Sequence, residues 1–227
     1  MKIGILQTGH TPDEMRPAVQ NYAQLFERFL DGQGFTFQTF DVVDMDFPVS
    51  IRDADGWLIT GSKHGVYEDH GFIPPLEQFI RDAYEADVPM VGICFGHQII
   101  AQALGGHVEK FRDGWSVGNQ SYDWQGQPIR LNAWHQDQVV AAPDGATRLA
   151  TNAFCENAAL VYGHRAFTVQ AHPEFESDFI DGLATHRAPG VVPQDLIDAA
   201  KATLDQPNDN ARLAQMVGRF FKERVVT

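Results

Sequence analysis

One cysteine of this sequence lies between two glycines where a strand pattern passes directly into a helix pattern. The segment reads Gly92-Ile-Cys94-Phe-Gly96; residues 89–93 form an apolar run of strand length, and residues 95–104 follow with helical spacing. A sharp strand-to-helix turn brings backbone segments close together, so small residues are needed on both sides of it. The spacing therefore predicts a nucleophile elbow with Cys94 at its tip.

The environment expected around Cys94 favours a reactive thiol. The helix that follows it directs unpaired N–H groups and the positive end of its dipole at the sulfur, which favours the thiolate. A buried structural cysteine in a parallel sheet would carry the same local pattern, so the glycine frame alone leaves both interpretations open. Cys155 has neither a glycine frame nor a strand-to-helix context, and we expect it to pack in the core.

Strand and helix patterns alternate through the first half of the chain, which favours a parallel sheet wrapped by helices. Residues 108–169 are rich in short strands and turn residues, as in a mixed or antiparallel extension. Strands are expected at residues 2–7, 35–40, 56–60, 89–93 and 167–171, and helices at residues 17–30, 76–86 and 95–104. We therefore expect an α/β fold with an open, mostly parallel sheet flanked by helices, an added mixed or antiparallel region and a helical C-terminal tail.

Length and charge limit the number of domains and the classes of function that are expected. With 227 residues and 44% hydrophobic content, one α/β domain is expected, with a catalytic core over residues 1–179 and a helical extension over residues 180–227. Lys and Arg total 17 against 30 Asp and Glu, a net charge of -13 that disfavours nucleic-acid binding. The N-terminal apolar run is too short for a signal sequence or membrane span, so a cytoplasmic location and no membrane partner are expected.

The two cysteines form no CxxC pattern and no Cys/His cluster, which argues against a disulfide framework and a structural zinc site. No metal and no cofactor are expected.

A thiol nucleophile needs an imidazole base, and the best candidate is His172 in the segment Gln170-Ala-His172-Pro-Glu174. Residues two apart in an extended chain project to the same side, so Glu174 can orient the imidazole while its other nitrogen faces Cys94. A surface turn carrying the same three residues is the competing interpretation.

The other histidines lack such a neighbour. His135 is the best rival base, and His97 is expected to be a helix-packing or hydrogen-bonding residue. His64 and His70 lie in loops rich in Gly, Pro and Asp, where a solvated or rim position is expected.

Acyl transfer from an amide also requires N–H donors for the tetrahedral oxyanion. The elbow supplies the N–H of Phe95, directly after the nucleophile. A second donor is expected from the loop after residues 56–60, where Gly61 and Ser62 end a neighbouring strand. The sequence does not decide which of these two donates. A phosphate-binding loop is disfavoured because the segment matches neither GxxxxGK[ST] nor GxGxxG.

The elbow motif Gly92-Ile-Cys94-Phe-Gly96-His-Gln98, followed by His172-Pro-Glu174, resembles the motifs of the class I (triad) glutamine amidotransferases over about residues 1–175. The resemblance implies a flavodoxin-like sheet and hydrolysis of glutamine through a γ-glutamyl thioester, releasing ammonia and glutamate. It assigns Cys94 as nucleophile, His172 as base and Glu174 as its orienter.

Further positions follow from the same resemblance. Gln98 is similar to the glutamine that contacts the α-amino acid group of the substrate. The segment His135-Gln136-Asp137 resembles one whose backbone lines the same pocket.

Two departures from the family pattern leave the reaction open. Gly61-Ser62-Lys63 stands where the GMP synthetase glutaminase has Gly-Gly-Pro, and no acceptor domain follows the core. Instead, residues 180–227 are expected to form a helical tail, in which residues 199–204 and 220–225 resemble the C-terminal end of plant γ-glutamyl peptidases. We therefore expect a stand-alone glutaminase acting on a small molecule, with a possible acceptor or synthase subunit. The alternative is a γ-glutamyl peptidase acting on glutathione-like compounds. A non-catalytic module ranks last because all three candidate catalytic residues are present.

Overall fold

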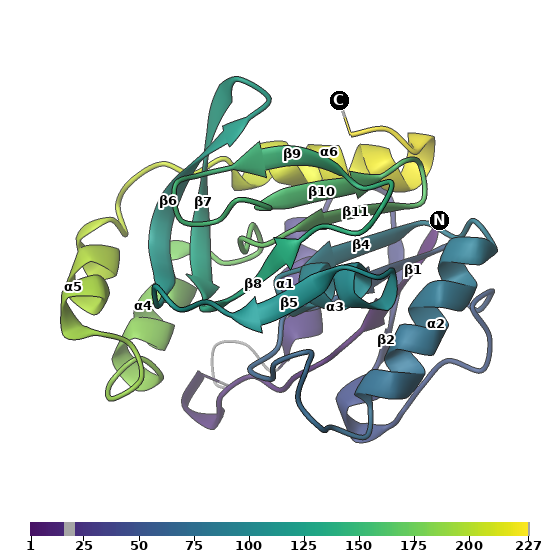
Figure 1. The fold of residues 1–227 in the computed structure, drawn as a ribbon, viewed down its shortest axis with the longest axis horizontal. Helices are drawn as coiled ribbons and strands as arrows, with labels where there is room; N and C mark the ends of the chain where they lie inside the picture. The colour runs from purple at the N-terminus through teal and green to yellow at the C-terminus, as the bar shows by residue number, and fades with distance from the viewer. Residues whose placement is uncertain (16–20, 227) are drawn as a thin grey trace.

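A nine-stranded sheet runs through the part of the chain that the computed structural model describes, residues 1–15 and 21–226. Its parallel half consists, in spatial order, of β2 (Thr36–Phe40), β1 (Lys2–Leu6), β3 (Gly56–Ile59), β4 (Met90–Ile93) and β11 (Ala166–Val169). The antiparallel half continues with β10 (Ala159–Tyr162), β9 (Thr147–Thr151), β6 (Ser116–Trp124) and β7 (Gln127–His135). The expected α/β class, with a mostly parallel sheet and an antiparallel extension, is confirmed (Figure 1).

Helices cover both faces of the parallel half because its strands are apolar on both sides. Alternate residues of β4 face opposite ways: Val91 packs with α1 (Tyr22–Phe29) and α6 (Asn210–Glu223), whereas Met90 packs with α2 (Ile73–Glu85) and α3 (Phe95–Ala103). This arrangement places α1 and α6 on one face and α2 and α3 on the other (Figure 1). The carboxyl ends of β3, β4 and β11 therefore meet at one edge, where ligands gather in open α/β sheets.

A second, separate sheet consists of two antiparallel strands, β5 (His107–Lys110) and β8 (Asp137–Ala141). β6 and β7 form a long hairpin whose turn is Gln125-Gly126, with φ of 51° and 84°. Positive φ at both central residues suits the twist of a two-residue hairpin, in agreement with the turn expected there.

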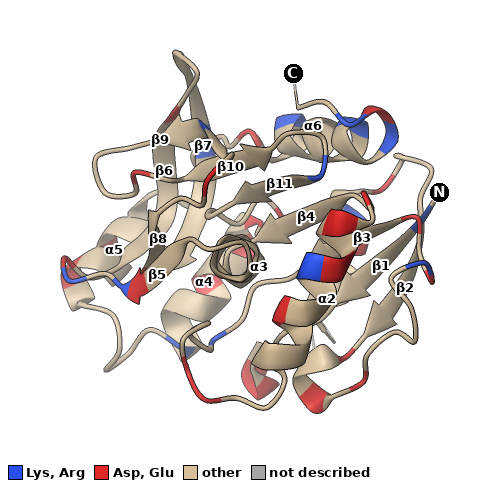
Figure 2. Cartoon of the chain, turned by 45° about the vertical axis from the view of Figure 1, so that its right-hand side comes forward, with Lys and Arg blue, Asp and Glu red and all other residues tan. Residues whose placement is uncertain are grey.

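The C-terminal helices are integrated with the sheet. α4 (Ser177–His186) and α5 (Gln194–Ala202) pack on the end of β6, and α6 returns across the parallel strands with Leu213, Val217 and Phe220 in the main core. Figure 2 shows acidic residues along α2 and basic residues along the last turns of α6. No helix within residues 1–15 and 21–226 has the length and apolar character required to cross a membrane.

Three predicted boundaries need comment. The helix expected over residues 17–30 begins only at Tyr22, because Asn21 is extended and caps it by accepting a hydrogen bond from the Gln24 N–H at 3.0 Å; residues 16–20 lie outside the described part. α2 begins at Ile73, earlier than the expected residue 76, since prolines are tolerated in the first helical turn, where their missing N–H has no partner to lose. β11 ends at Val169, whereas residues 167–171 were expected to be extended.

Candidate active site

The strand-to-helix junction at Cys94 is a strained elbow, as predicted. Cys94 has φ of 53° and ψ of -103°, and α3 begins at the next residue. A Cβ on Gly92 would collide with the carbonyl of Gly96, and one on Gly96 would collide with the carbonyl of Ile59. Both glycines are therefore required, and the strain they permit holds the thiol at the sheet edge.

His172 and Glu174 form a buried pair beside this elbow. The imidazole Nδ1 lies 2.7 Å from the Oε1 of Glu174, and the two residues are 4% and 5% exposed. The expected pairing is confirmed, but the expected reason is wrong because the strand has already ended. Instead, the N–H of Phe175 donates to the His172 carbonyl at 3.2 Å, closing a turn around Pro173.

The imidazole also meets the thiol. The side chain of Cys94 lies close enough to raise the pKa of His172, and the Cys94 N–H donates to the carbonyl of Val169, at the end of β11, at 2.9 Å. Burial alone lowers the pKa of His172, but the charges of Glu174 and Cys94 outweigh it and raise that pKa to about 10. The surroundings of His172 therefore favour its protonated, imidazolium form.

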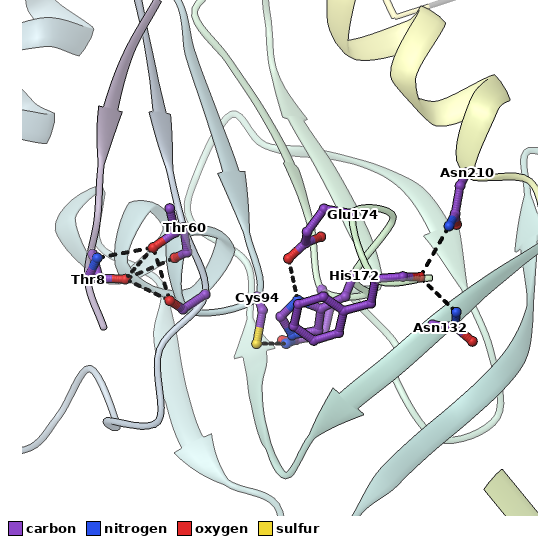
Figure 3. Close-up of polar contacts among 10 residues, drawn as sticks. Thr8, Thr60, Cys94, Asn132, His172, Glu174 and Asn210 are labelled. Atoms are coloured by element: carbon purple, nitrogen blue, oxygen red, sulfur yellow. Dashed lines mark hydrogen bonds and ion pairs between the residues drawn. The ribbon is translucent and has the colours of Figure 1, made fainter. Parts of the chain in front are cut away.

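The turn that carries His172 is held from two other elements (Figure 3). The ring of Phe175 stacks on the imidazole with centroids 4.0 Å apart. The carbonyl of Phe175 accepts hydrogen bonds from the Nδ2 of Asn132, on β7, at 2.9 Å and from the Nδ2 of Asn210, at the start of α6, at 3.2 Å. Sequence reasoning identified none of these three residues.

Two buried glutamines connect the helix after the elbow to the thiol. Gln98 donates its Nε2 to the Asp137 carbonyl at 2.9 Å and to the Oε1 of Gln170 at 3.1 Å. Gln170 in turn directs its Nε2 at the Sγ of Cys94, 3.7 Å away. Both side chains are almost fully buried. Gln170 was not singled out in the sequence, although it lies two residues before His172.

The loop after β3 lies against the reacting groups. A Cβ on Gly61 would fall 2.8 Å from the His172 Cε1 and 3.6 Å from the Cys94 Cβ, so only glycine fits there. The Ser62 hydroxyl instead donates to the carbonyl of Thr8 at 2.7 Å. The Thr8 hydroxyl donates to the Gly61 carbonyl at 3.1 Å and fixes the loop from β1 (Figure 3). Gly61 is thus the loop residue in contact with the thiol and the imidazole.

The segment after β7 forms a third side of the site. His135 is buried, and burial followed by the charge of His172 lowers its pKa to about 3, so the imidazole is neutral. The Nδ1 of His135 lies 3.3 Å from the Asp137 carbonyl. The carboxylate of Glu174 contacts His172 and not this rival base. Gln136 donates its amide to Phe111 at 3.4 Å. Asp137 accepts from the Tyr67 hydroxyl at 3.0 Å, and burial raises the pKa of its carboxyl.

Two residues outside this group pack in the interior. His97 is fully buried with its Nδ1 2.8 Å from the Thr168 hydroxyl, which agrees with its expected hydrogen-bonding role. Cys155 is buried too, and burial followed by the charge of Cys94 raises the pKa of its thiol to about 12. The prediction that Cys155 packs in the core is confirmed.

Known proteins share this architecture. A model of the family described as Glutamine amidotransferase class-I matches residues 19–181. Identity to Gamma-glutamyl peptidase 4 of Arabidopsis thaliana is 28%, over 94% of this chain and 93% of that protein. Identity to one subunit of the glutamine-hydrolyzing GMP synthase of Halobacterium salinarum is 33%, over 60% of this chain and 75% of that protein. The structure of a glutamine amido transferase from Methylobacillus flagellatus matches with a TM-score of 0.72 and 24% identity, covering 99% of this chain and 94% of that one, and bears on the fold alone.

Proposed function

Because the chain belongs to the class-I glutamine amidotransferases, a family of enzymes, we propose that it hydrolyses the γ-amide of glutamine through a γ-glutamyl thioester on Cys94. The observation that carries the proposal is the buried contact of 2.7 Å between His172 and Glu174, which lies beside Cys94. This is the arrangement of nucleophile, base and orienter that acyl transfer from an amide requires.

The proposed reaction begins with the thiolate of Cys94. Its attack on the γ-carbonyl carbon forms the C–S bond and places a negative charge on the carbonyl oxygen, which the N–H groups of Phe95 and Gly61 would stabilise. Collapse of this intermediate breaks the C–N bond while the His172 imidazolium protonates the leaving nitrogen, and ammonia departs. Water, deprotonated by His172, then attacks the thioester and releases glutamate and the thiolate.

The proposal assigns the second oxyanion donor to Gly61 rather than Ser62. Gly61 contacts both the His172 ring and the Cys94 Cβ, whereas the Ser62 side chain binds the Thr8 carbonyl. The substrate's α-amino and α-carboxylate groups would lie against the segment that Gln98 holds. In this arrangement Gln98 acts by fixing the Asp137 carbonyl, and the backbone of His135, Gln136 and Asp137 lines the pocket.

A second candidate substrate is a γ-glutamyl peptide, attacked at the same carbonyl but with an amino acid as leaving group. The observation that favours it is the extent of the match. The match to the relative named a γ-glutamyl peptidase covers 94% of this chain, whereas the match to the GMP synthase protein covers only 60%. If glutamine is the substrate, we propose an acceptor or synthase subunit that consumes the ammonia as the partner of this chain. We place either reaction in the cytoplasm.

One assay separates the two substrates. Purified protein is incubated with glutamine and, separately, with γ-glutamyl dipeptides, and ammonia and free amino acid are measured in each. Ammonia from glutamine supports the first reaction, and amino acid from dipeptides without ammonia from glutamine supports the second. Release of neither product contradicts both. Cys94→Ser provides the blank. If His172→Asn accumulates an acyl-enzyme, the proton transfer that this variant lacks belongs to deacylation.

A further inference from the structure

Three side chains with metal-binding donors converge on the loop between β3 and α2. The Nε2 of His70 lies 2.8 Å from the Oε2 of Glu68, and the Nδ1 of His64 lies 3.8 Å from the same oxygen. The two imidazole rings have centroids 4.1 Å apart. Taken together, one donor atom from each residue lies within 4.8 Å of the other two.

This spacing is close to what a single tetrahedral zinc ion needs. Zinc binds imidazole nitrogen and carboxylate oxygen at about 2.0–2.2 Å, which separates neighbouring ligand atoms by about 3.3–3.6 Å. The measured separation of 2.8 Å between His70 and Glu68 would lengthen slightly, and that of 3.8 Å between His64 and Glu68 would shorten slightly. Both changes are smaller than about 1 Å.

The loop holds these residues in place before any ion arrives. The Glu68 N–H donates to the Gly65 carbonyl at 3.1 Å, and the His70 N–H donates to the Glu68 carbonyl at 3.0 Å. The His64 N–H donates to the Ser62 hydroxyl at 3.2 Å, and the His70 ring stacks on Phe72. A loop tied at each ligand loses little further freedom when the ion binds.

We propose that His64, Glu68 and His70 bind a Zn²⁺ ion, with a water molecule in the fourth position. Two imidazoles and one carboxylate are a donor set that suits zinc, whereas calcium and magnesium prefer oxygen ligands alone. From the sequence, His64 and His70 were expected only at a solvated or rim position, because they lie in loops rich in Gly, Pro and Asp. The site is independent of the hydrolysis proposed for Cys94.

A bound ion would also affect the loop beside Cys94. The loop that would carry zinc continues from Gly61. It is joined to the segment after β7 by the hydrogen bond of 3.0 Å between Tyr67 and Asp137. A bound ion would therefore fix the loop that borders the thiol. The competing interpretation is a hydrogen bond between His70 and Glu68 with no metal.

The experiment uses Cys94→Ala protein, because a cysteine thiolate beside an imidazole is itself a zinc ligand. Zinc is titrated against a chromophoric chelator, and binding of one ion per chain is expected. Loss of an outer-shell partner costs roughly 10- to 100-fold in metal affinity. Because His64 and His70 would bind the ion directly, His64→Ala and His70→Ala in the same background should each weaken zinc binding by more than this. His164→Ala is the matched control, because His164 pairs with Asp87 at 2.9 Å on the surface without a third ligand.

Cobalt provides the second measurement. Co²⁺ in a tetrahedral site absorbs strongly in the visible range, and this absorption should appear in Cys94→Ala protein and in its His164→Ala variant but not in the His64→Ala and His70→Ala variants. Thermal unfolding without metal checks that all variants fold. Zinc affinity unchanged by His64→Ala and His70→Ala, or absent from the Cys94→Ala protein, would overturn the proposal.

Discussion

The ring of Phe175 lies flat against the imidazole of His172, with centroids 4.0 Å apart and planes within 3° of parallel. The backbone carbonyl of Phe175 is held by Asn132 and Asn210, so the position of the imidazole depends on β7 and α6 as well as on its own turn. The C-terminal helix is therefore connected to the proposed base through a single residue.

Replacing Phe175 with leucine should misplace the imidazole while keeping the site apolar. An aromatic pair contributes about 0.5–1.5 kcal/mol beyond its buried area, so kcat/KM should fall by up to about tenfold. Phe179→Leu is the control, because Phe179 packs on Phe175 with centroids 4.4 Å apart and belongs to the same apolar cluster. An equal loss of kcat/KM in the two variants would show that general packing, and not the stack on His172, is responsible.

Asn210→Ala should weaken both stability and activity, although Asn210 lies far along the chain from His172. Removing a buried partner costs about 1–3 kcal/mol, which urea denaturation measures. Asn132 still holds the same carbonyl in this variant. We therefore expect the Asn132→Ala/Asn210→Ala double variant to lose more stability than the two single losses combined. Strict additivity would mean that the two side chains do not act together on Phe175.

The two cysteines should differ completely in reactivity. Cys94→Ser should abolish turnover, because the nucleophile is lost, whereas Cys155→Ser should keep nearly all of it. Iodoacetamide should likewise label only Cys94 in the folded protein, since the thiol of Cys155 is buried and its pKa is raised to about 12. Mass spectrometry of tryptic peptides identifies the labelled residue. Comparable labelling of Cys155 would contradict the assignment.

The local part of the site could be predicted because local sterics determine it. Glycines on both sides of Cys94 indicated the elbow, and the structure shows that a Cβ at either position collides with backbone. The pairing of His172 with Glu174 was predicted as well, but from strand alternation. The contact arises instead from the turn around Pro173, which the spacing of the two residues could not distinguish from an extended chain.

The parts that escaped prediction are contacts between distant segments. Asn210 reaches Phe175 across 35 positions of sequence, and Gln170 reaches Cys94 across 76. Neither contact follows from a short motif, because each depends on how helices and strands pack. The proposed zinc ligands His64, Glu68 and His70 are close in sequence, yet only the fold of their loop turns their donors toward each other.

Gln170→Ala should slow the reaction by removing the amide that Gln170 directs at the thiol. The loss of one hydrogen bond, about 0.5–1.5 kcal/mol, corresponds to about tenfold or less in kcat. A purely structural role would not change the reactivity of the sulfur, so alkylation of Cys94 at neutral pH is measured alongside and should slow too. Gln138→Ala removes a comparably buried glutamine, bonded to the Phe154 carbonyl, and should leave alkylation unchanged.

Glu174→Gln should change how stability depends on pH. Burial lowers the pKa of His172, but the charges of Glu174 and Cys94 raise it from 6.5 to about 10 in the folded protein. A pKa raised by folding contributes stability that is fully present below pH 6.5 and is lost as pH rises through about 10. The variant lacks the Glu174 charge. The advantage of the unmodified protein in Tm should therefore be largest near neutral pH and shrink toward pH 10.

Thermal unfolding of both proteins between neutral pH and pH 10 measures this advantage. Glu109→Gln provides the comparison, because Glu109 pairs with His107 at 3.7 Å in an exposed setting where solvent screens the charges. Its difference from the unmodified protein should stay small across the range. A Tm advantage over Glu174→Gln that does not shrink as pH rises would mean that His172 is neutral in the folded protein. In that case Glu174 would orient the ring without stabilising an imidazolium, and the thiol would have to lose its proton to His172 only when the substrate binds.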